Sequence, residues 1–210
     1  MRSVYDITTE FERKLCEYTG APYAVSVDNQ SNALFLALMY EASIGKVGRT
    51  LSIPKHTYPS VPCAIIHSGN HVNFVDSTKI LTGEYPLFGS KVWDSALRFT
   101  ANMYREDQMQ CLSFTGPYKH LKLGKAGAIL TDSKEAYKWL KKARFSGRSE
   151  CSYHDDYFDM LGWNFYLLPE IAAKGVRDMQ QFYNLDGTPK DTTDISLPYP
   201  DLSQFKIYKQ

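Results

Sequence analysis

Residues 110–119 read Gln-Cys-Leu-Ser-Phe-Thr-Gly-Pro-Tyr-Lys, and an earlier stretch, residues 91–94, reads Lys-Val-Trp-Asp. Both contain a short, mostly apolar segment of the kind that forms a buried strand, and a charged side chain follows or ends each one. Ligands of an open α/β sheet bind outside the carboxyl ends of its strands. Lys119 and Asp94 are therefore expected at one edge of a sheet, where a site can form.

A lysine and an aspartate in this arrangement can hold pyridoxal phosphate. The amine binds the aldehyde of the cofactor, while the carboxylate pairs with the pyridinium nitrogen and makes the ring an electron sink. Each residue alone also has a simpler interpretation, because an aspartate after a strand often caps the next helix and most lysines are solvated. The cofactor interpretation therefore depends on further residues.

Two earlier segments supply them. Asn29, Gln30 and Ser31 lie between an expected strand and an apolar helix, where free backbone N–H groups and a hydroxyl can bind a phosphate. Tyr58 follows another expected strand and can lie against a planar ring. Alone, the loop is more often an ordinary helix cap, and the tyrosine is more often packed in the core or at its rim. The order phosphate loop, aromatic residue, aspartate, lysine favours the functional interpretation.

Strands alternate with helices along most of the chain, which predicts an α/β fold with a mostly parallel sheet between helices. Expected strands cover residues 23–27, 51–54, 71–75, 91–94, 110–113 and 128–131, and expected helices cover 11–20, 32–42, 58–67, 134–145 and 169–182. Thr9 and Glu12 have the spacing of a capping box, so the first helix is expected to begin at Thr9. Residues 1–183 are predicted to form one domain, and residues 184–210 an irregular, loose or docked tail.

Charge and cysteine content exclude several classes of protein. The 210 residues include 24 Lys and Arg against 23 Asp and Glu, so no general attraction for nucleic acid or an anionic membrane is expected. Four single cysteines without disulfide spacing, and no leader or long apolar run, favour a cytoplasmic protein outside the membrane. The pairs Cys151/His154 and Cys63/His67 lack a second ligand pair, so no metal is expected.

The motifs resemble, in order, those of the DegT/DnrJ/EryC1/StrS sugar aminotransferases. The resemblance covers roughly residues 5–183 and is carried by Tyr-Ala-Val-Ser-Val at 23–27, Asn-Gln-Ser-Asn-Ala-Leu at 29–34, Ile-Pro-Lys-His-Thr-Tyr at 53–58, Trp-Asp-Ser-Ala at 93–96, the loop 113–121 and Gly-Trp-Asn-Phe at 162–165. It implies the large domain of a fold type I enzyme that depends on pyridoxal phosphate (PLP), with Lys119 and Asp94 as catalytic residues.

The same resemblance implies a cofactor site, substrates and an oligomer. The implied cofactor-binding residues are Asn29, Gln30, Ser31, Tyr58, Asp94, Ser113, Lys119 and Asn164. Asn164 would reach a neighbouring subunit's cofactor, so the family pattern implies a homodimer with shared active sites. An amino donor, glutamate in most of the family, would supply the amino group to a keto sugar linked to a nucleotide. The implied substrate contacts are His120, Lys125 and Arg148, with Arg144 as a further candidate, although residues 141–148 could equally form a solvated basic helix face.

The chain also departs from the family pattern. The smaller carboxy-terminal domain is missing from this sequence, and the stretch between Asp76 and Asp94 is short, so one strand and one helix are expected to be missing as well. Gln30 replaces a glycine, Leu97 a glutamine or histidine, and Tyr166 an arginine. Two alternatives to the aminotransferase therefore stay open, namely a scaffold without turnover and a PLP-dependent sugar dehydratase. Dehydratases of the family carry histidine in place of the lysine, so Lys119 favours amination.

Overall fold

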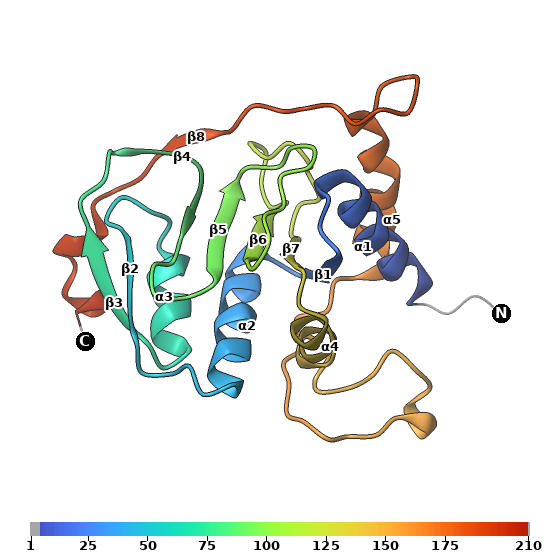
Figure 1. The fold of residues 1–210 in the computed structure, drawn as a ribbon, viewed down its shortest axis with the longest axis horizontal. Helices are drawn as coiled ribbons and strands as arrows, with labels where there is room; N and C mark the ends of the chain where they lie inside the picture. Colours follow the sequence, from blue (N-terminus) through green and yellow to red (C-terminus); the bar gives the residue numbers. More distant parts are fainter. Residues whose placement is uncertain (1–4, 210) are drawn as a thin grey trace.

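The computed structural model describes residues 5–209 and builds them around a six-stranded sheet (Figure 1). The strand order is β1 (Tyr23–Val27), β7 (Gly127–Thr131), β6 (Met109–Ser113), β5 (Val92–Leu97), β4 (Ile80–Pro86) and β8 (Ser196–Pro198). A second sheet pairs β2 (Thr50–Pro54) with β3 (His71–Val75) in parallel. The α/β class is confirmed. The six-stranded sheet is mixed rather than mostly parallel, because β5 and β6 are parallel whereas its other neighbouring strands are antiparallel.

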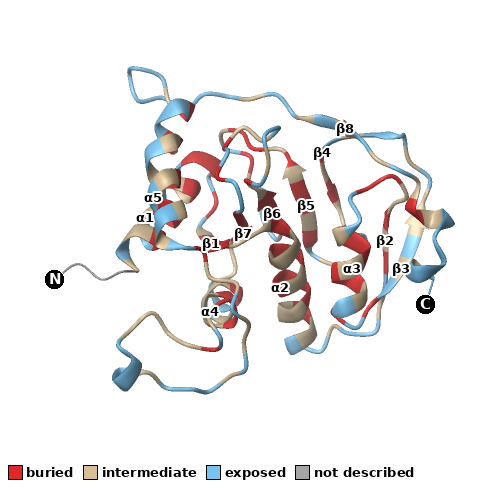
Figure 2. Cartoon of the chain, turned by 180° about the vertical axis from the view of Figure 1, so that it is seen from behind, coloured by how far each residue is buried: buried red, intermediate tan, exposed pale blue. Residues whose placement is uncertain are grey.

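Helices cover both faces of this sheet, as expected. They are α1 (Asp6–Thr19), α2 (Gln30–Ser43), α3 (Ser60–His67), α4 (Lys134–Ala143) and α5 (Pro169–Asp178). Helices α2, α3 and α4 share one apolar core with the strand residues that face one side of the sheet. Helices α1 and α5 share a second apolar core with the strand residues that face the other side. Figure 2 shows the buried stripe of α2 turned toward the strands. No helix within residues 5–209 is long and apolar enough to cross a membrane.

The directions of three strands create one functional edge. Strand β1 is antiparallel to β7, which is antiparallel to β6, and β6 is parallel to β5. The carboxyl ends of β1, β5 and β6 therefore meet at one edge, where α2 begins. Gly127 permits this approach, because a Cβ on it would lie 2.7 Å from the backbone nitrogen of Gln30 and 2.9 Å from the carbonyl oxygen of Leu112. The start of α2 is thus held close against the sheet.

The capping box predicted at Thr9 is not formed. Helix α1 begins at Asp6, so Thr9 lies inside it, and Glu12 turns into the protein, where it is 4% exposed. Glu12 accepts hydrogen bonds from the backbone N–H and the hydroxyl of Ser26, at 2.9 and 2.8 Å. It also pairs with Lys141 at 2.9 Å and with Arg144. Glu12 is buried together with the apolar side chains of Phe11 and Leu15, so its carboxylate serves the interior instead of capping the helix.

Arg144 is fully buried in this network, which corrects its assignment as a candidate substrate contact. Besides Glu12, its guanidinium binds Glu150 at 2.5 Å and the hydroxyl of Ser26 at 2.9 Å. Within residues 141–148, the side that carries Arg144 is therefore internal and not solvated. An arginine surrounded by carboxylates can be buried without leaving an unpaired charge.

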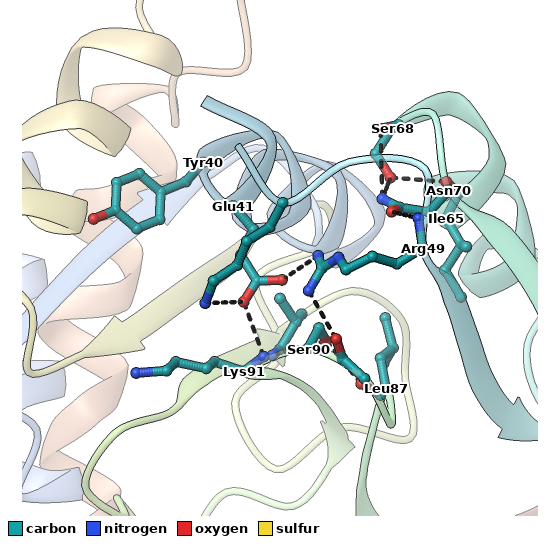
Figure 3. Close-up of polar contacts among 12 residues, drawn as sticks. Tyr40, Glu41, Arg49, Ile65, Ser68, Asn70, Leu87, Ser90 and Lys91 are labelled. Carbon is teal, nitrogen blue, oxygen red and sulfur yellow. Dashed lines mark hydrogen bonds and ion pairs between the residues drawn. The ribbon is translucent and has the colours of Figure 1, made fainter. Parts of the chain in front are cut away.

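A second buried carboxylate fixes the other end of α2 (Figure 3). Glu41 is 1% exposed and pairs with Arg49 at 2.6 Å, and it accepts a hydrogen bond from the backbone N–H of Lys91 at 3.0 Å. Arg49 also donates to the carbonyl oxygen of Gly89 at 2.7 Å. These contacts tie α2 to the start of β2 and to the turn between β4 and β5.

Two segments differ from the sequence expectation. The short stretch before β5 contains no helix in the described structure, but it does form strand β4, antiparallel to β5. The tail after residue 183 is largely irregular, yet it includes β8, which pairs with β4. Figure 1 shows the tail running along the edge of the sheet from α5 to the β2–β3 end.

Candidate active site

A cavity of about 440 Å³ lies at the edge where β5 and β6 end and α2 begins. The N-terminus of α2, the segment after β2, strands β4 and β5, the loop after β6 and the tail all line it. The cavity brings together these sequence-predicted residues: Asn29, Gln30, Ser31, Tyr58, Asp94, Ser113, Lys119 and Lys125. Segments from Asn29 to Tyr199, far apart in the chain, thus meet at one place.

Asp94 is a buried acceptor at the floor of this cavity. Its Oδ1 accepts hydrogen bonds from Gln30 Nε2 at 3.0 Å and from the backbone N–H of Ala96 at 2.9 Å, and its Oδ2 accepts one from the Tyr85 hydroxyl at 2.9 Å. Burial raises the pKa of Asp94, although the backbone N–H of Ala96, the Tyr85 hydroxyl and the Lys119 charge oppose the rise. A carboxylate has about four acceptor positions, so one is left for a further donor.

Lys119 lies beside Asp94 in the same cavity. Its ammonium donates to the carbonyl oxygen of Ala96 at 2.5 Å. Burial lowers the pKa of Lys119, and the nearby charge of Asp94 only partly offsets this. The unprotonated, nucleophilic amine is therefore reached at lower pH than in a solvated lysine.

This shift predicts the pH dependence of Lys119 acylation. The amine reacts when unprotonated, so a lowered pKa moves the midpoint of its acetylation by acetic anhydride below the usual lysine value of about 10.4. Asp94→Asn removes the charge that raises the pKa of Lys119, and it should move the midpoint further down. The rate at Lys119 is followed by peptide mapping, with Nα-acetyl-lysine as the reference amine. A midpoint at or above that of the reference would contradict the burial of the amine.

The N-terminus of α2 presents unpaired backbone donors to the cavity. The Asn29 side chain caps the helix by accepting from the backbone N–H of Asn32 at 2.9 Å. The first amides, those of Gln30 and Ser31, have no partner within the helix, and the helix dipole adds positive potential there. Lys125 stands at the same edge, 3.7 Å from Asp28. This end of the cavity can hold an anion such as a phosphate.

Sequence reasoning missed several residues that complete the site. Tyr85 is buried between Asp94 and Thr57, whose hydroxyl lies 2.5 Å from that of the tyrosine. The tail contributes Leu197 and Tyr199 to the lining. The alternation in β4 is interrupted by Gly83, and the tail contains several prolines, so neither segment gives a clear strand signal. Gln30, noted as a departure from the family pattern, is one of the residues that orient Asp94.

Three predicted site residues lie outside the cavity. Nε2 of His120 is 2.8 Å from the carbonyl oxygen of Thr193. Arg148 pairs with Asp156 at 3.2 Å and its guanidinium lies over the rings of Phe145 and Tyr153. Asn164 is exposed and pairs through its backbone with Phe145. The chain therefore does not bring these three residues to its own cavity.

Comparison with known proteins tests the resemblance found in the motifs. The model of the DegT/DnrJ/EryC1/StrS aminotransferase family matches residues 1–81. No curated protein sequence matches the chain significantly.

Solved structures extend the likeness beyond residue 81. A Bacillus cereus protein assigned as a PLP-dependent aminotransferase superposes with a TM-score of 0.69 at 19% identity, over 85% of this chain and 59% of that one. PseC from Helicobacter pylori, an aminotransferase of pseudoaminic acid biosynthesis, gives 0.66 at 15% identity over 83% and 57%. The dehydratase ColD, which acts on GDP-4-keto-6-deoxymannose, gives 0.63 at 15% identity over 84% and 61%.

The chain thus spans roughly three fifths of the length of these structures. The TM-scores establish a common fold, and at identities this low the likeness concerns the fold alone. The family match includes the segment Asn29 to Ser31 and Tyr58. The resemblance is confirmed: residues 1–81 match the DegT/DnrJ/EryC1/StrS aminotransferase family, and the chain has the fold of PLP-dependent aminotransferases.

Proposed function

We propose that this protein is a PLP-dependent aminotransferase that moves an amino group from an amino acid, glutamate in the first instance, to a keto sugar linked to a nucleotide. The observation that carries the proposal is the single cavity in which Lys119, Asp94 and the N-terminus of α2 meet. An amine, a buried carboxylate and an anion site are the three groups that a phosphorylated pyridine aldehyde requires.

The residues present fit this cofactor. Asp94 has one acceptor position free after three hydrogen bonds, and burial raises its pKa, so a cationic ring nitrogen would supply a further favourable charge. The amides of Gln30 and Ser31 would hold the phosphate, and Tyr58, whose side chain is 56% exposed, would lie against the ring. When bound, the cofactor supplies an electron sink that stabilises negative charge on a substrate carbon.

The residues of the chain would supply the proton transfers and the electrostatics. Nζ of Lys119, which becomes unprotonated more readily because it is buried, can accept a proton from the α-carbon of the amino donor and return it. Gln30 and Tyr85 hold Asp94 in a fixed orientation from two sides. In this orientation the carboxylate would be held ready to pair with the ring nitrogen of a bound cofactor.

Binding of the cofactor and of the substrate involves a second subunit in this proposal. Asn164 is exposed outside its own cavity, and Tyr157, Phe158 and Leu161 of the preceding loop are 77%, 58% and 92% exposed. A homodimer that covers these side chains would deliver Asn164, and with it Arg148, to the partner's cavity. Lys125 is the basic side chain of this cavity available to a diphosphate.

The dehydratase alternative has less support. The likeness to ColD concerns the fold, and His120 is held by the backbone of Thr193 rather than lining the cavity. Lys119 occupies the position beside Asp94. A scaffold without turnover would have no use for a nucleophilic amine that costs desolvation energy to bury.

Spectroscopy of the protein loaded with PLP tests the proposal. Glutamate should remove the visible absorbance of the bound cofactor and convert it to the amino form, and a nucleotide-linked keto sugar should restore the band. Asp94→Asn keeps the shape of the side chain but loses its charge, so it should slow the first conversion by about tenfold or more. A bound cofactor that is inert to every amino acid tested would leave the scaffold as the function.

A further inference from the structure

The tail contributes one wall of the cavity through residues 195–199. In this segment side chains alternate, with Ile195, Leu197 and Tyr199 half-buried and Ser196 and Pro198 exposed. Such alternation is that of an edge strand with one face on the protein. Leu197 lies opposite Leu81 in the pairing with β4, and both line the cavity together with Tyr199.

Contacts at both ends of the segment fix its position. The backbone N–H of Ile195 donates to the carbonyl oxygen of Leu97 at 2.8 Å, and Gly83 donates to that of Ile195 at 3.1 Å. Gly83 has φ +69°, and a Cβ on it would lie 2.3 Å from a carboxylate oxygen of Asp194. Glycine suits this position mainly because an L side chain is strained at this positive φ, while the Asp194 carboxylate also lies where a Cβ would be.

The far end is tied to the segment that carries Tyr58. The backbone N–H of Tyr199 donates to the carbonyl oxygen of Lys79 at 3.1 Å, and His56 donates from Nδ1 to the carbonyl oxygen of Tyr199 at 2.9 Å. Leu202, which is buried, donates to the carbonyl oxygen of Lys55 at 2.9 Å. Tyr199 is thus held on both of its backbone polar groups, next to the loop that leads to Tyr58.

The ring of Tyr199 lies next to that of Tyr58, and both residues line the cavity. It packs edge to face against the ring of Tyr58, with centroids 6.1 Å apart and an interplanar angle of 74°. Burial, together with the nearby charge of Asp94, raises the pKa of Tyr199 to about 12, so its hydroxyl stays neutral at physiological pH. The hydroxyl forms no hydrogen bond with any residue that the structure describes.

We infer that Tyr199 is a cofactor-positioning residue, whose ring, presented by strand β8 and buttressed by Tyr58, closes the cavity over the group bound beside Asp94 and Lys119. The inference rests on the proposed function, because the group in question is PLP. It assigns to the tail a binding role that its irregular sequence does not suggest. The aromatic ring rather than the hydroxyl makes the main contact, since the ring is the part that packs against Tyr58.

Titration of the protein with PLP, followed by the visible absorbance of the bound form, tests this assignment. Tyr199→Ala should weaken cofactor affinity by about tenfold or more and shift the absorbance maximum, because an aromatic wall of the site is lost. Tyr199→Phe keeps the ring and should stay within about threefold of wild type. Tyr208→Ala is the matched control, because Tyr208 also lies in the tail and packs on Phe74 but does not line the cavity.

The outcomes separate the inference from the proposed function. A wild-type protein that takes up no PLP would overturn both. Normal uptake by wild type with unchanged affinity in Tyr199→Ala would overturn the inference alone, as would a Tyr199→Phe variant as weak as Tyr199→Ala. Equal weakening by Tyr208→Ala would assign the effect to tail docking in general and overturn the role of the ring. An unchanged unfolding midpoint in each variant confirms that binding, and not folding, is compared.

Discussion

Lys119→Ala should abolish covalent trapping of PLP. Borohydride reduces the bond between the cofactor aldehyde and a lysine amine, and the cavity places Lys119 beside Asp94 at the end where that bond would form. We expect one labelled peptide in wild type, containing Lys119, and a yield in the variant that falls by about a hundredfold or more, since surface lysines react only weakly. The measurement is peptide mapping by mass spectrometry after reduction.

Lys122→Ala is the matched control for this experiment. Lys122 belongs to the same loop but is exposed and does not line the cavity, so its loss should leave the label on Lys119 unchanged. The fold should survive in both variants, because the Lys119 side chain contributes a single hydrogen bond, to the carbonyl oxygen of Ala96. Undiminished label on another lysine of Lys119→Ala would refute the assignment.

Arg144→Met should cause the largest loss of stability of any substitution considered. Glu12 is buried and pairs with Arg144 and Lys141. Burial alone would raise the pKa of Glu12, but the two cations and the hydrogen bond from Ser26 together lower it. Removal of one partner of a buried ion pair typically costs about 3–5 kcal/mol, because the remaining charge is left uncompensated. The loss is measured as a change in the free energy of unfolding by urea denaturation.

Two further variants give this prediction its contrast. Arg13 also pairs with two glutamates, Glu10 and Glu17, but on the exposed face of α1, so Arg13→Met should leave the urea midpoint close to that of wild type. In the double variant Glu12→Gln/Arg144→Met, the uncompensated carboxylate is also removed, and part of the stability should return. Equal losses in Arg13→Met and Arg144→Met would contradict the importance of burial.

The sequence by itself determined the alternation of elements and most of the site. Apolar periodicity located α2 and the strands from β1 to β7 apart from β4, because buried segments must present apolar side chains at the period of their own backbone. The charged residues at strand ends, Lys119 and Asp94, were visible for the same reason, since polar side chains stand out next to apolar strands. The order of these residues along the chain, together with the family resemblance, was therefore enough to predict which main polar groups meet at one edge of the sheet.

The tertiary structure decided what depends on distant partners. Strand β4 and the tail have no strong propensity of their own, and they become strands because each pairs with the other and β4 pairs with β5. The direction of each strand, and hence the mixed sheet, is set by such pairing rather than by local sequence. The sequence also could not distinguish Arg144, which is buried in an ion network, from Lys125, which lines the cavity, because burial of a charge depends on which opposite charges the fold brings to it.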